Sequence, residues 1–420
     1  GVVVDKSTRV GIKHRYYKGY ANVFNTSVTS KVMGLVLEDV MKVEGHRVDM
    51  MLASIDRTSE IETRIRSGTS LGTGNYIIEV GLGTPKETLD VVVDTGSDLA
   101  WTQCKPCSGP NSCYSQKDLI FDPSRSSSYK SVACDAPLCK LVGRRTASGC
   151  TRANACEYGI QYLDGSFTAG TVATDTLTVG AARIPSYALG CGRNNEGIFN
   201  GFDGLLGFSR DALAFPAQSR SGIFTYCLPS PFSPIGTGFL DFGSATTTAT
   251  SWSALQFSNS SLYAVPLSSV RVNSRSVTAP ASGRPGSVII IDSGTVITRL
   301  DSALYIKVRD AFRQGTSHLA TAPSDAGLGL FDTCYKLRVG SEIAIPTVTF
   351  VLGGAAHNLP FTPPAASLLY PVDDNGTVCF AFAPIQSDDA LSVLGNYQQQ
   401  GFSFSFDIAH NSLSIKPNAC

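Results

Sequence analysis

Apolar residues through most of this chain come in short runs, which either alternate with polar residues or stay continuous, with Gly, Ser, Asn and Pro between them. Clear examples are the runs at 76–80 and 402–406. This pattern is typical of short β-strands joined by turns. We therefore expect a mainly β fold from about residue 70 to the end of the chain.

Two segments instead show the spacing of helices. The stretch 31–66 is long and poor in Gly and Pro, and 303–313 follows a residue that can cap a helix, Asp301 or Ser302. The apolar positions at helical spacing are Val48, Met51, Leu52 and Ile55 in the first segment and Leu304, Val308 and Phe312 in the second. We expect one or two amphipathic helices in the first segment and a single helix in the second.

The composition changes near residue 70. All four Met precede this point, and all twelve Cys follow it. Between the two parts, 67–74 contains only Gly, Ser, Thr and Leu, which is the composition of an exposed linker that a processing protease can reach. We therefore expect an N-terminal segment, 1–68, that is separate from the body of the protein.

Charge and cysteine content narrow the class of protein. Lys and Arg number 34, as do Asp and Glu, so we expect no nucleic acid and no anionic membrane as a partner. No apolar run reaches the roughly 18 residues that cross a bilayer. An even number of Cys favours disulfides and an oxidising compartment. Sequons at Asn25, Asn259 and Asn375 are compatible with a secreted glycoprotein.

Two acidic triplets carry the candidate chemistry. Asp94 begins an Asp-Thr-Gly triplet and Asp292 begins an Asp-Ser-Gly triplet, each directly after three Val or Ile residues. Each apolar run predicts a buried strand, and the Gly lets the backbone turn sharply, which leaves the carboxylate in a loop at the strand end. Apolar-apolar-Gly elements follow at 205–207 and 393–395. This repetition predicts two related lobes whose Asp loops face each other.

With these motifs the chain resembles the pepsin-type aspartic proteases, most closely the plant nepenthesin-like and nucellin-like branch, over roughly 70–420. The resemblance implies a bilobal, mainly β, pepsin-like fold with pseudo-twofold symmetry, preceded by a partly helical propeptide. Its further motifs are Gly74-Asn75-Tyr76, Gly83-Thr84-Pro85, Trp101, Tyr162, Asp164-Gly165-Ser166 and the cysteine spacing.

The resemblance implies that Asp94 and Asp292 are the catalytic pair. Two carboxyl groups within hydrogen-bonding distance cannot both ionise cheaply, so such a pair keeps one proton at acidic pH and can activate a water for attack on a peptide carbonyl. In the family, hydroxyls matching Ser97 and Thr295 orient the carboxylates, and those matching Thr95 and Ser293 interlock the loops. The supporting residues are thus Thr95, Gly96, Ser97, Ser293, Gly294 and Thr295.

The resemblance also implies a flap, a hairpin that closes over the substrate and excludes water. Tyr162 matches the flap tyrosine, and Trp101 matches its hydrogen-bonding partner, although either ring could simply fill the core. The flap turn contains Asp164, Gly165 and Ser166. Leu163 stands where the family commonly has Gly, so we expect a stiffer tip.

The cysteines allow a rival chemistry, because Cys104 and Cys107 have the spacing of a redox pair or half a zinc site. No second closely spaced Cys or His pair completes four ligands, so we expect no metal and no cofactor. The resemblance implies six disulfides instead: Cys104 with Cys107, Cys113 with Cys191, Cys134 with Cys156, Cys139 with Cys150, Cys227 with Cys420, and Cys334 with Cys379.

We therefore expect a monomeric aspartic endopeptidase, made as a zymogen, that hydrolyses peptides or proteins at acidic pH and binds pepstatin-like inhibitors. The expected parts are a propeptide-like segment (1–68), an N-terminal lobe with Asp94 and the flap (69–245), and a C-terminal lobe with Asp292 (246–420). The expected location is the apoplast, the vacuole or a plastid.

Two other functions are possible for this fold. Some plant relatives, similar to xylanase inhibitors and storage globulins, have lost catalysis and bind other molecules. The sequence of 292–300 is similar to that of relatives described as chloroplast nucleoid DNA-binding proteases. That function needs a basic face, and only the first twenty residues are plainly basic.

Overall fold

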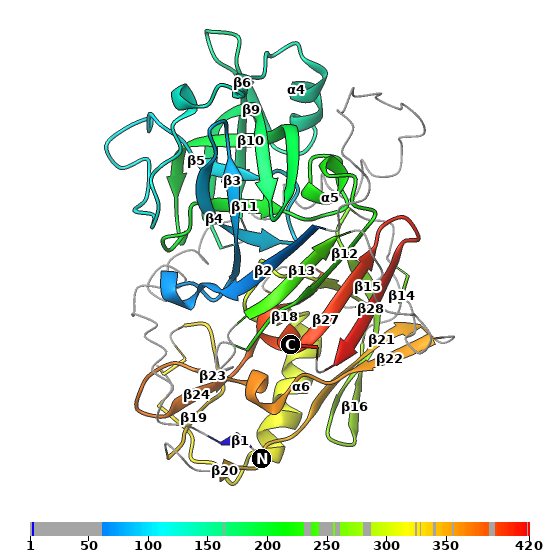
Figure 1. Ribbon diagram of the computed structural model, residues 1–420. Coiled ribbons are helices and arrows are strands. Elements are labelled where there is room, and N and C mark those ends of the chain that lie inside the picture. The colour runs from blue at the N-terminus through cyan, green and yellow to red at the C-terminus, as the bar shows by residue number, and fades with distance from the viewer. Residues whose placement is uncertain are drawn as a thin grey trace.

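The computed structural model describes residues 2–3, 61–162, 164–230, 237–242, 255–256, 261–279, 287–323, 326–327, 329–338, 342–354, 357–385, 391–417 and 419–420. Leu163, the sequons at Asn25 and Asn259, and the part of the predicted N-terminal helices up to residue 60 lie outside the described residues. Figure 1 shows two lobes joined by a layer of strands that runs between them. The predicted bilobal, mainly β fold is confirmed.

The largest sheet has 15 strands and contains the N-terminal lobe and the layer between the lobes. In spatial order its strands are β14 (Leu255–Gln256), β28 (Ser412–Pro417), β27 (Phe402–Asp407), β12 (Ile223–Cys227), β13 (Thr237–Phe242), β2 (Ile61–Ser67), β3 (Tyr76–Leu82), β4 (Glu87–Asp94), β11 (Gly204–Gly207), β5 (Trp101–Gln103), β10 (Ala182–Glu196), β9 (Phe167–Val179), β8 (Cys156–Gln161) and β7 (Ala147–Cys150), with β6 (Lys130–Ser131) on β9.

The C-terminal lobe is built on smaller sheets. An eight-stranded sheet contains, in order, β22 (His357–Phe361), β21 (Val348–Gly354), β15 (Ala264–Val272), β17 (Val288–Ile291), β26 (Ser392–Leu394), β18 (Thr298–Leu300) and β25 (Phe382–Pro384), with β16 (Arg275–Thr278) on β15. A three-stranded sheet contains β19 (Cys334–Lys336), β24 (Thr377–Phe380) and β23 (Leu369–Pro371), and β1 (Val2–Val3) pairs with β20 (Glu342–Ile343).

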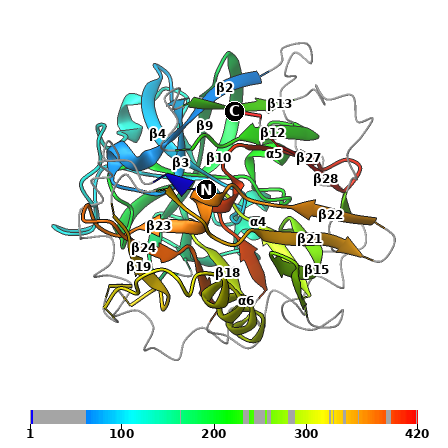
Figure 2. The ribbon, with the colours of Figure 1, turned by 90° about the horizontal axis from the view of Figure 1, so that it is seen from below.

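Helices are few and short among the described residues. They are α4 (Pro137–Val142), α5 (Phe215–Gln218), α6 (Ser302–Gly315) and α7 (Asn396–Gln399), with 3-10 turns η2 (Gly68–Leu71), η3 (Pro123–Arg125) and η4 (Ala365–Leu368). The predicted helix at 303–313 is confirmed as α6, and Asp301 caps it by accepting the Leu304 N–H at 3.1 Å. It lies on the outside of the C-terminal lobe beside β18 and β15 (Figure 2).

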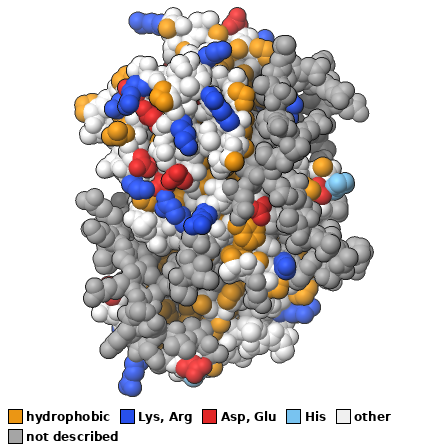
Figure 3. All heavy atoms as spheres, in the orientation of Figure 1, with side chains coloured by type: hydrophobic (Ala, Val, Ile, Leu, Met, Phe, Trp, Pro, Cys, Tyr) orange, Lys and Arg blue, Asp and Glu red, His pale blue; other side chains and the backbone are white. Residues whose placement is uncertain are grey.

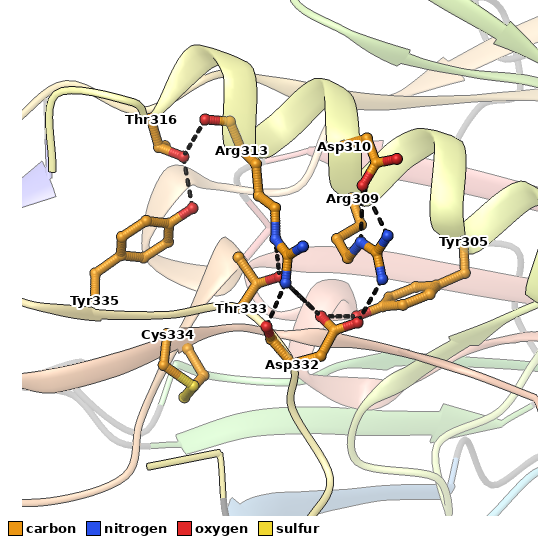
Figure 4. A network of polar contacts seen from close by, with 10 residues as sticks. Tyr305, Arg309, Asp310, Arg313, Thr316, Asp332, Thr333, Cys334 and Tyr335 are labelled. Carbon is orange, nitrogen blue, oxygen red and sulfur yellow. Dashed lines mark hydrogen bonds and ion pairs between the residues drawn. A yellow bond between two sulfur atoms is a disulfide. The ribbon is translucent and has the colours of Figure 1, made fainter. Parts of the chain in front are cut away.

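A polar network fastens α6 to the loop before β19. Asp332 accepts hydrogen bonds from Tyr305 and Arg309, each at 2.7 Å, and Arg313 donates to the backbone carbonyl of Asp332 (Figure 4). One turn further on, the hydroxyls of Thr316 and Tyr335 meet at 2.6 Å. The network therefore orients the exposed side of α6 while its apolar side packs on the lobe.

Two expectations about the N-terminal segment are wrong. Residues 61–66 belong to β2, not to a helix, because β2 pairs with β13 over six residues in the layer between the lobes. Residues 67–74 are not an exposed linker throughout: Gly68 and Thr73 are buried, and the Gly68 N–H donates to the Asn75 carbonyl at 2.8 Å. A β-carbon at Gly68 would lie against Thr73, so this turn needs glycine.

The two lobes share a buried apolar core. A single cluster contains Ile78 and Val93 from the N-terminal lobe and Ile291 and Phe350 from the C-terminal lobe. It also contains Phe404 of the intervening layer. The strands that carry the Asp loops therefore pack on one continuous core, which fixes the position of the loop at the end of each strand. No helix among the described residues is long and apolar enough to cross a membrane.

Candidate active site

The two Asp loops meet at the junction of the lobes. Strand β4 ends at Asp94, and Asp292 directly follows β17. Each strand is flanked by a parallel partner from the later apolar-apolar-Gly element, β11 in one lobe and β26 in the other. A β-carbon at Gly96 would lie 2.8 Å from the Asp292 carboxyl, and one at Gly294 would overlap the Asp94 carboxyl. Each carboxyl thus lies against the glycine of the opposite loop. The two loops face each other, as the sequence predicts.

Reciprocal hydrogen bonds lock the loops together. The Thr95 hydroxyl accepts the Ser293 N–H at 2.9 Å and donates to the Ile291 carbonyl at 3.0 Å. The Ser293 hydroxyl accepts the Thr95 N–H at 3.1 Å and donates to the Val93 carbonyl at 2.7 Å. All four residues are buried, so each bond satisfies a donor and an acceptor that water cannot reach. The predicted interlock is present and has twofold symmetry.

The carboxylates are held asymmetrically. Asp94 and Asp292 each accept the N–H of the glycine two residues on, both at 2.8 Å. The Thr295 hydroxyl also donates to Asp292 at 2.6 Å, as predicted. The Ser97 hydroxyl lies close enough to Asp94 to lower its pKa, but it forms no hydrogen bond of good geometry with any described residue. The predicted hydrogen bond to the carboxylate is therefore seen for Thr295, and the role of Ser97 stays a prediction.

The electrostatics fit a shared proton. Burial, and next the charge of Asp292, raise the pKa of Asp94 well above its ordinary value. The two like charges lie close together, so ionising one carboxyl opposes ionising its neighbour. The Asp94 carboxyl therefore favours its protonated form next to Asp292.

The predicted flap is a tight turn between β8 and β9. The Tyr162 N–H donates to the Ser166 carbonyl at 2.8 Å, and Gly165, at φ 85°, donates its N–H to the Tyr162 carbonyl at 2.9 Å. The Asp164 carboxylate accepts the Ser166 N–H at 2.9 Å. The Trp101 indole donates to the Tyr162 hydroxyl at 2.7 Å, as the resemblance implies. Burial and the nearby charge of Asp94 raise the pKa of Tyr162 well above its usual range.

Three further residues contact the flap or the second Asp loop. The Phe199 ring packs edge-on against Trp101 at 5.0 Å and against Tyr162 at 6.2 Å, so it forms an apolar wall behind the flap. Asn75 donates to the Gly294 carbonyl at 2.5 Å and so ties the N-terminal lobe to the second Asp loop. Gln399 donates to the Asp292 carbonyl at 3.1 Å. Asn75 belongs to the Gly74-Asn75-Tyr76 motif of the family resemblance, but no role was predicted for it. Gln399 had a usable signal, a run of three Gln after an apolar-apolar-Gly element, and Phe199 had none.

Six disulfides use all twelve cysteines, but four of the predicted pairings are wrong. The bonds are Cys104–Cys191, Cys107–Cys113, Cys134–Cys150, Cys139–Cys156, Cys227–Cys420 and Cys334–Cys379, and only the last two were predicted. Strand register decides the first: β5 and β10 run side by side, which brings Cys191 next to the end of β5 and hence to Cys104. Cys104 and Cys107 therefore form no redox pair with each other.

Other partners find little support in the described residues. These residues contain no cluster of three or more His, Cys, Asp and Glu that could hold a metal ion. On the face shown in Figure 3, basic side chains are interspersed with acidic ones over the N-terminal lobe and do not form a continuous basic stripe. This face therefore does not favour nucleic-acid binding.

Comparison with known proteins gives the family. Residues 76–244 match the family described as Xylanase inhibitor N-terminal, and 262–417 match Xylanase inhibitor C-terminal. Over 379 residues the chain is 39% identical to Aspartyl protease family protein 2 of Arabidopsis thaliana, which covers 87% of this chain and 75% of that protein. Over 401 residues it is 31% identical to Aspartic proteinase nepenthesin-1 of Nepenthes gracilis, with 92% and 86% covered.

The chain therefore belongs to the pepsin-like family of plant aspartic proteases, and the predicted resemblance is confirmed. Among solved structures, basic 7S globulin from soybean matches with a TM-score of 0.67 and 18% identity, covering 86% of this chain and 97% of that protein. That match shows the fold alone.

Proposed function

We propose that this protein is an aspartic endopeptidase in which Asp94 and Asp292 activate water for attack on a peptide bond. The observation that carries the proposal is the meeting of two complete Asp loops, each carboxyl resting against the glycine of the other loop. The two relatives named above carry the names aspartyl protease and aspartic proteinase, which supports the same class.

The geometry suggests how the pair acts. The ionised carboxyl takes a proton from a water while the protonated carboxyl donates one to the peptide carbonyl oxygen, which gives a tetrahedral diol without a covalent enzyme adduct. Collapse of the diol returns a proton to the departing amine and breaks the C–N bond. The pair must hold one proton for this cycle, so activity falls as rising pH removes it.

The flap supplies the enclosure. Tyr162 lies near enough to Asp94 for that charge to raise its pKa, and the Trp101 indole donates to its hydroxyl. Phe199 packs against both rings. Closure of this turn over an extended peptide would exclude water from the carboxyl pair. Leu163, at the tip, lies outside the described residues, and its proposed stiffening effect stays a prediction.

We also propose that the chain is a monomeric, exported zymogen whose processing occurs before Ile61. Strand β2 supports this revised boundary, because it lies between β13 and β3, and Ile65 is fully buried. Arg66 of β2 pairs with the buried Asp90 at 2.5 Å. Removal of 1–68 would take a strand from the middle of a sheet. The N-terminal sequence of the acid-processed protein tests this: a start after residue 68 would contradict it.

A binding or inhibitor protein on the same fold is the second candidate. The description of the matching family is that of xylanase inhibitors, and soybean basic 7S globulin shares the fold. Both acidic triplets of this chain are complete, which favours the enzyme. Incubation of the processed protein with a denatured substrate at several acidic pH values distinguishes the two. Pepstatin-sensitive cleavage supports the enzyme, whereas no cleavage together with tight binding to a xylanase supports the inhibitor.

A further inference from the structure

Three consecutive glutamines lie buried beneath the second Asp loop. Gln398 and Gln399 are fully inaccessible and Gln400 is 5% exposed, although glutamine is seldom buried in proteins. The first two are the last residues of α7, directly behind the Gly395 turn. A buried amide is tolerated when its donors and acceptor are bonded, so the partners of each side chain indicate what it holds in place.

Gln399 is fully bonded, and its partners lie at the catalytic pair. Its amide nitrogen donates to the backbone carbonyls of Asp292, at 3.1 Å, and Leu394, at 2.8 Å. Its amide oxygen accepts the Tyr226 hydroxyl at 2.6 Å. The opposite amide orientation would place an oxygen against two carbonyl oxygens, so the network fixes which end faces Asp292. Tyr226 belongs to β12, in the layer between the lobes, and is fully buried.

The backbone carbonyls of Asp94 and Asp292 accept hydrogen bonds from different kinds of donor. In the first lobe, the backbone N–H of Phe208, the residue after Gly207, donates to the Asp94 carbonyl at 2.7 Å. In the second lobe, the matching residue after the glycine is Asn396, and its N–H donates to the Thr295 carbonyl at 2.7 Å instead. The Asp292 carbonyl instead accepts a hydrogen bond from a side chain, the amide nitrogen of Gln399.

We propose that Gln399 is a positioning residue for Asp292, and that Tyr226 holds its amide in the required orientation. The Asp292 carbonyl belongs to the peptide plane that leads to Ser293 and on to Gly294, whose N–H binds the Asp292 carboxylate. Rotation of that plane would move the carboxylate away from Asp94. This inference rests on the proposed function, but it concerns a geometry that can be measured without turnover.

The test compares Gln399→Met with Gln398→Met, which keep side-chain length and remove the amide. Gln398 is a matched control, because it is equally buried and fully bonded, but it binds Thr298 and backbone carbonyls away from Asp292. We expect Gln399→Met to lower kcat about 10- to 100-fold with KM within about twofold, and Gln398→Met to leave kcat within about threefold. Tyr226→Phe, a milder change, should lower kcat by about 3- to 10-fold.

Gln399→Glu gives a readout that a purely structural role would not produce. Protonated at low pH, the new carboxyl can donate one hydrogen bond to the Asp292 carbonyl, whereas the ionised form repels it. Activity should therefore approach the wild-type value at the acid end and fall at lower pH than in the wild type. Equal loss of kcat in both Met variants, or an unchanged pH profile in the Glu variant, would overturn the positioning role.

Carboxyl carbon NMR of aspartate-labelled protein keeps this test separate from the proposed function. An inactive wild type would refute the endopeptidase, yet the titration of Asp94 and Asp292 would still be measurable. We expect Gln399→Met to shift this titration and Gln398→Met to leave it unchanged. If neither variant shifts it, Gln399 does not position Asp292.

Discussion

Asp98 offers a quantitative test of the electrostatics beside the first Asp loop. It lies four residues after Asp94 and accepts the Ser209 hydroxyl at 2.5 Å. Asp211 is nearby and forms its own ion pair with Arg145 at 2.7 Å, so a single guanidinium faces two carboxyls. Burial, and next the charge of Asp211, raise the pKa of Asp98 to about 6. We predict that Asp98→Asn stabilises the protein at neutral pH.

The sign and size follow from proton linkage. Between the unfolded value of 3.8 and about 6, the folded chain keeps the Asp98 proton while the unfolded chain has lost it. The free energy of unfolding therefore falls as pH rises through this interval, by up to about 3 kcal/mol. Asp98 keeps partial contact with solvent, so about 1 to 3 kcal/mol is expected. The Asn variant lacks this loss, and its amide oxygen can still accept the Ser209 hydroxyl.

Urea unfolding at pH 3.5 and pH 7, followed by circular dichroism, measures the effect. All proteins carry Asp292→Asn, so that self-digestion cannot distort the curves. Asp98→Asn should raise the free energy of unfolding by about 1 to 3 kcal/mol more at pH 7 than at pH 3.5. Asp90→Asn is a control with the opposite sign. Burial would raise the Asp90 pKa, but Arg66 and Lys117 lower it overall. This variant should therefore lose more stability at pH 7 than at pH 3.5. An Asp98→Asn effect that is equal at both pH values would refute the reasoning.

Three further predictions concern the flap, the interlock and the longest disulfide. Trp101→Phe keeps an aromatic side chain but removes the hydrogen bond to the flap tyrosine, so kcat/KM should fall about 3- to 10-fold. An unchanged kcat/KM would show that this hydrogen bond is dispensable. Thr95→Val leaves buried partners unbonded and should lower the unfolding free energy by about 2 to 4 kcal/mol in urea, whereas a loss below about 1 kcal/mol would contradict the interlock. Replacing Cys227 and Cys420 by Ser opens a loop of 193 residues and should cost about 3 to 5 kcal/mol, while an unchanged urea midpoint would argue against this.

Structure that depends on neighbouring residues alone could be predicted from the sequence. Three β-branched residues before Asp-x-Gly predict a strand that ends in a loop, and a cap followed by apolar residues at spacing four predicts α6. The repetition of the first pattern was enough to expect opposed carboxyls. The family resemblance added Tyr162 and Trp101, which no local spacing would have brought together.

Structure that depends on segments far apart in the chain could not be predicted from the sequence. Strand β2 reads as the end of a helical segment, but pairing with β13, far along the chain, overrides that local preference. Cysteine partners depend on which strands lie side by side, and seven cysteines within 104–156 leave many pairings open. Ser97 and Thr295 hold equivalent positions in sequence, yet the Thr295 hydroxyl donates to Asp292 with good geometry and the Ser97 hydroxyl beside Asp94 does not. Symmetry in the sequence does not guarantee symmetry in the hydrogen bonds.

The most direct test of the central claim is the pH dependence of kcat/KM for a fluorogenic peptide, measured with the wild type, Asp94→Asn and Asp292→Asn. A pair that shares one proton predicts a bell-shaped profile at acidic pH for the wild type. Each variant should lose at least about a thousandfold at every pH, because either Asn abolishes the exchange of protons. If either variant keeps activity within about tenfold of the wild type, the two carboxyls do not act as one catalytic unit.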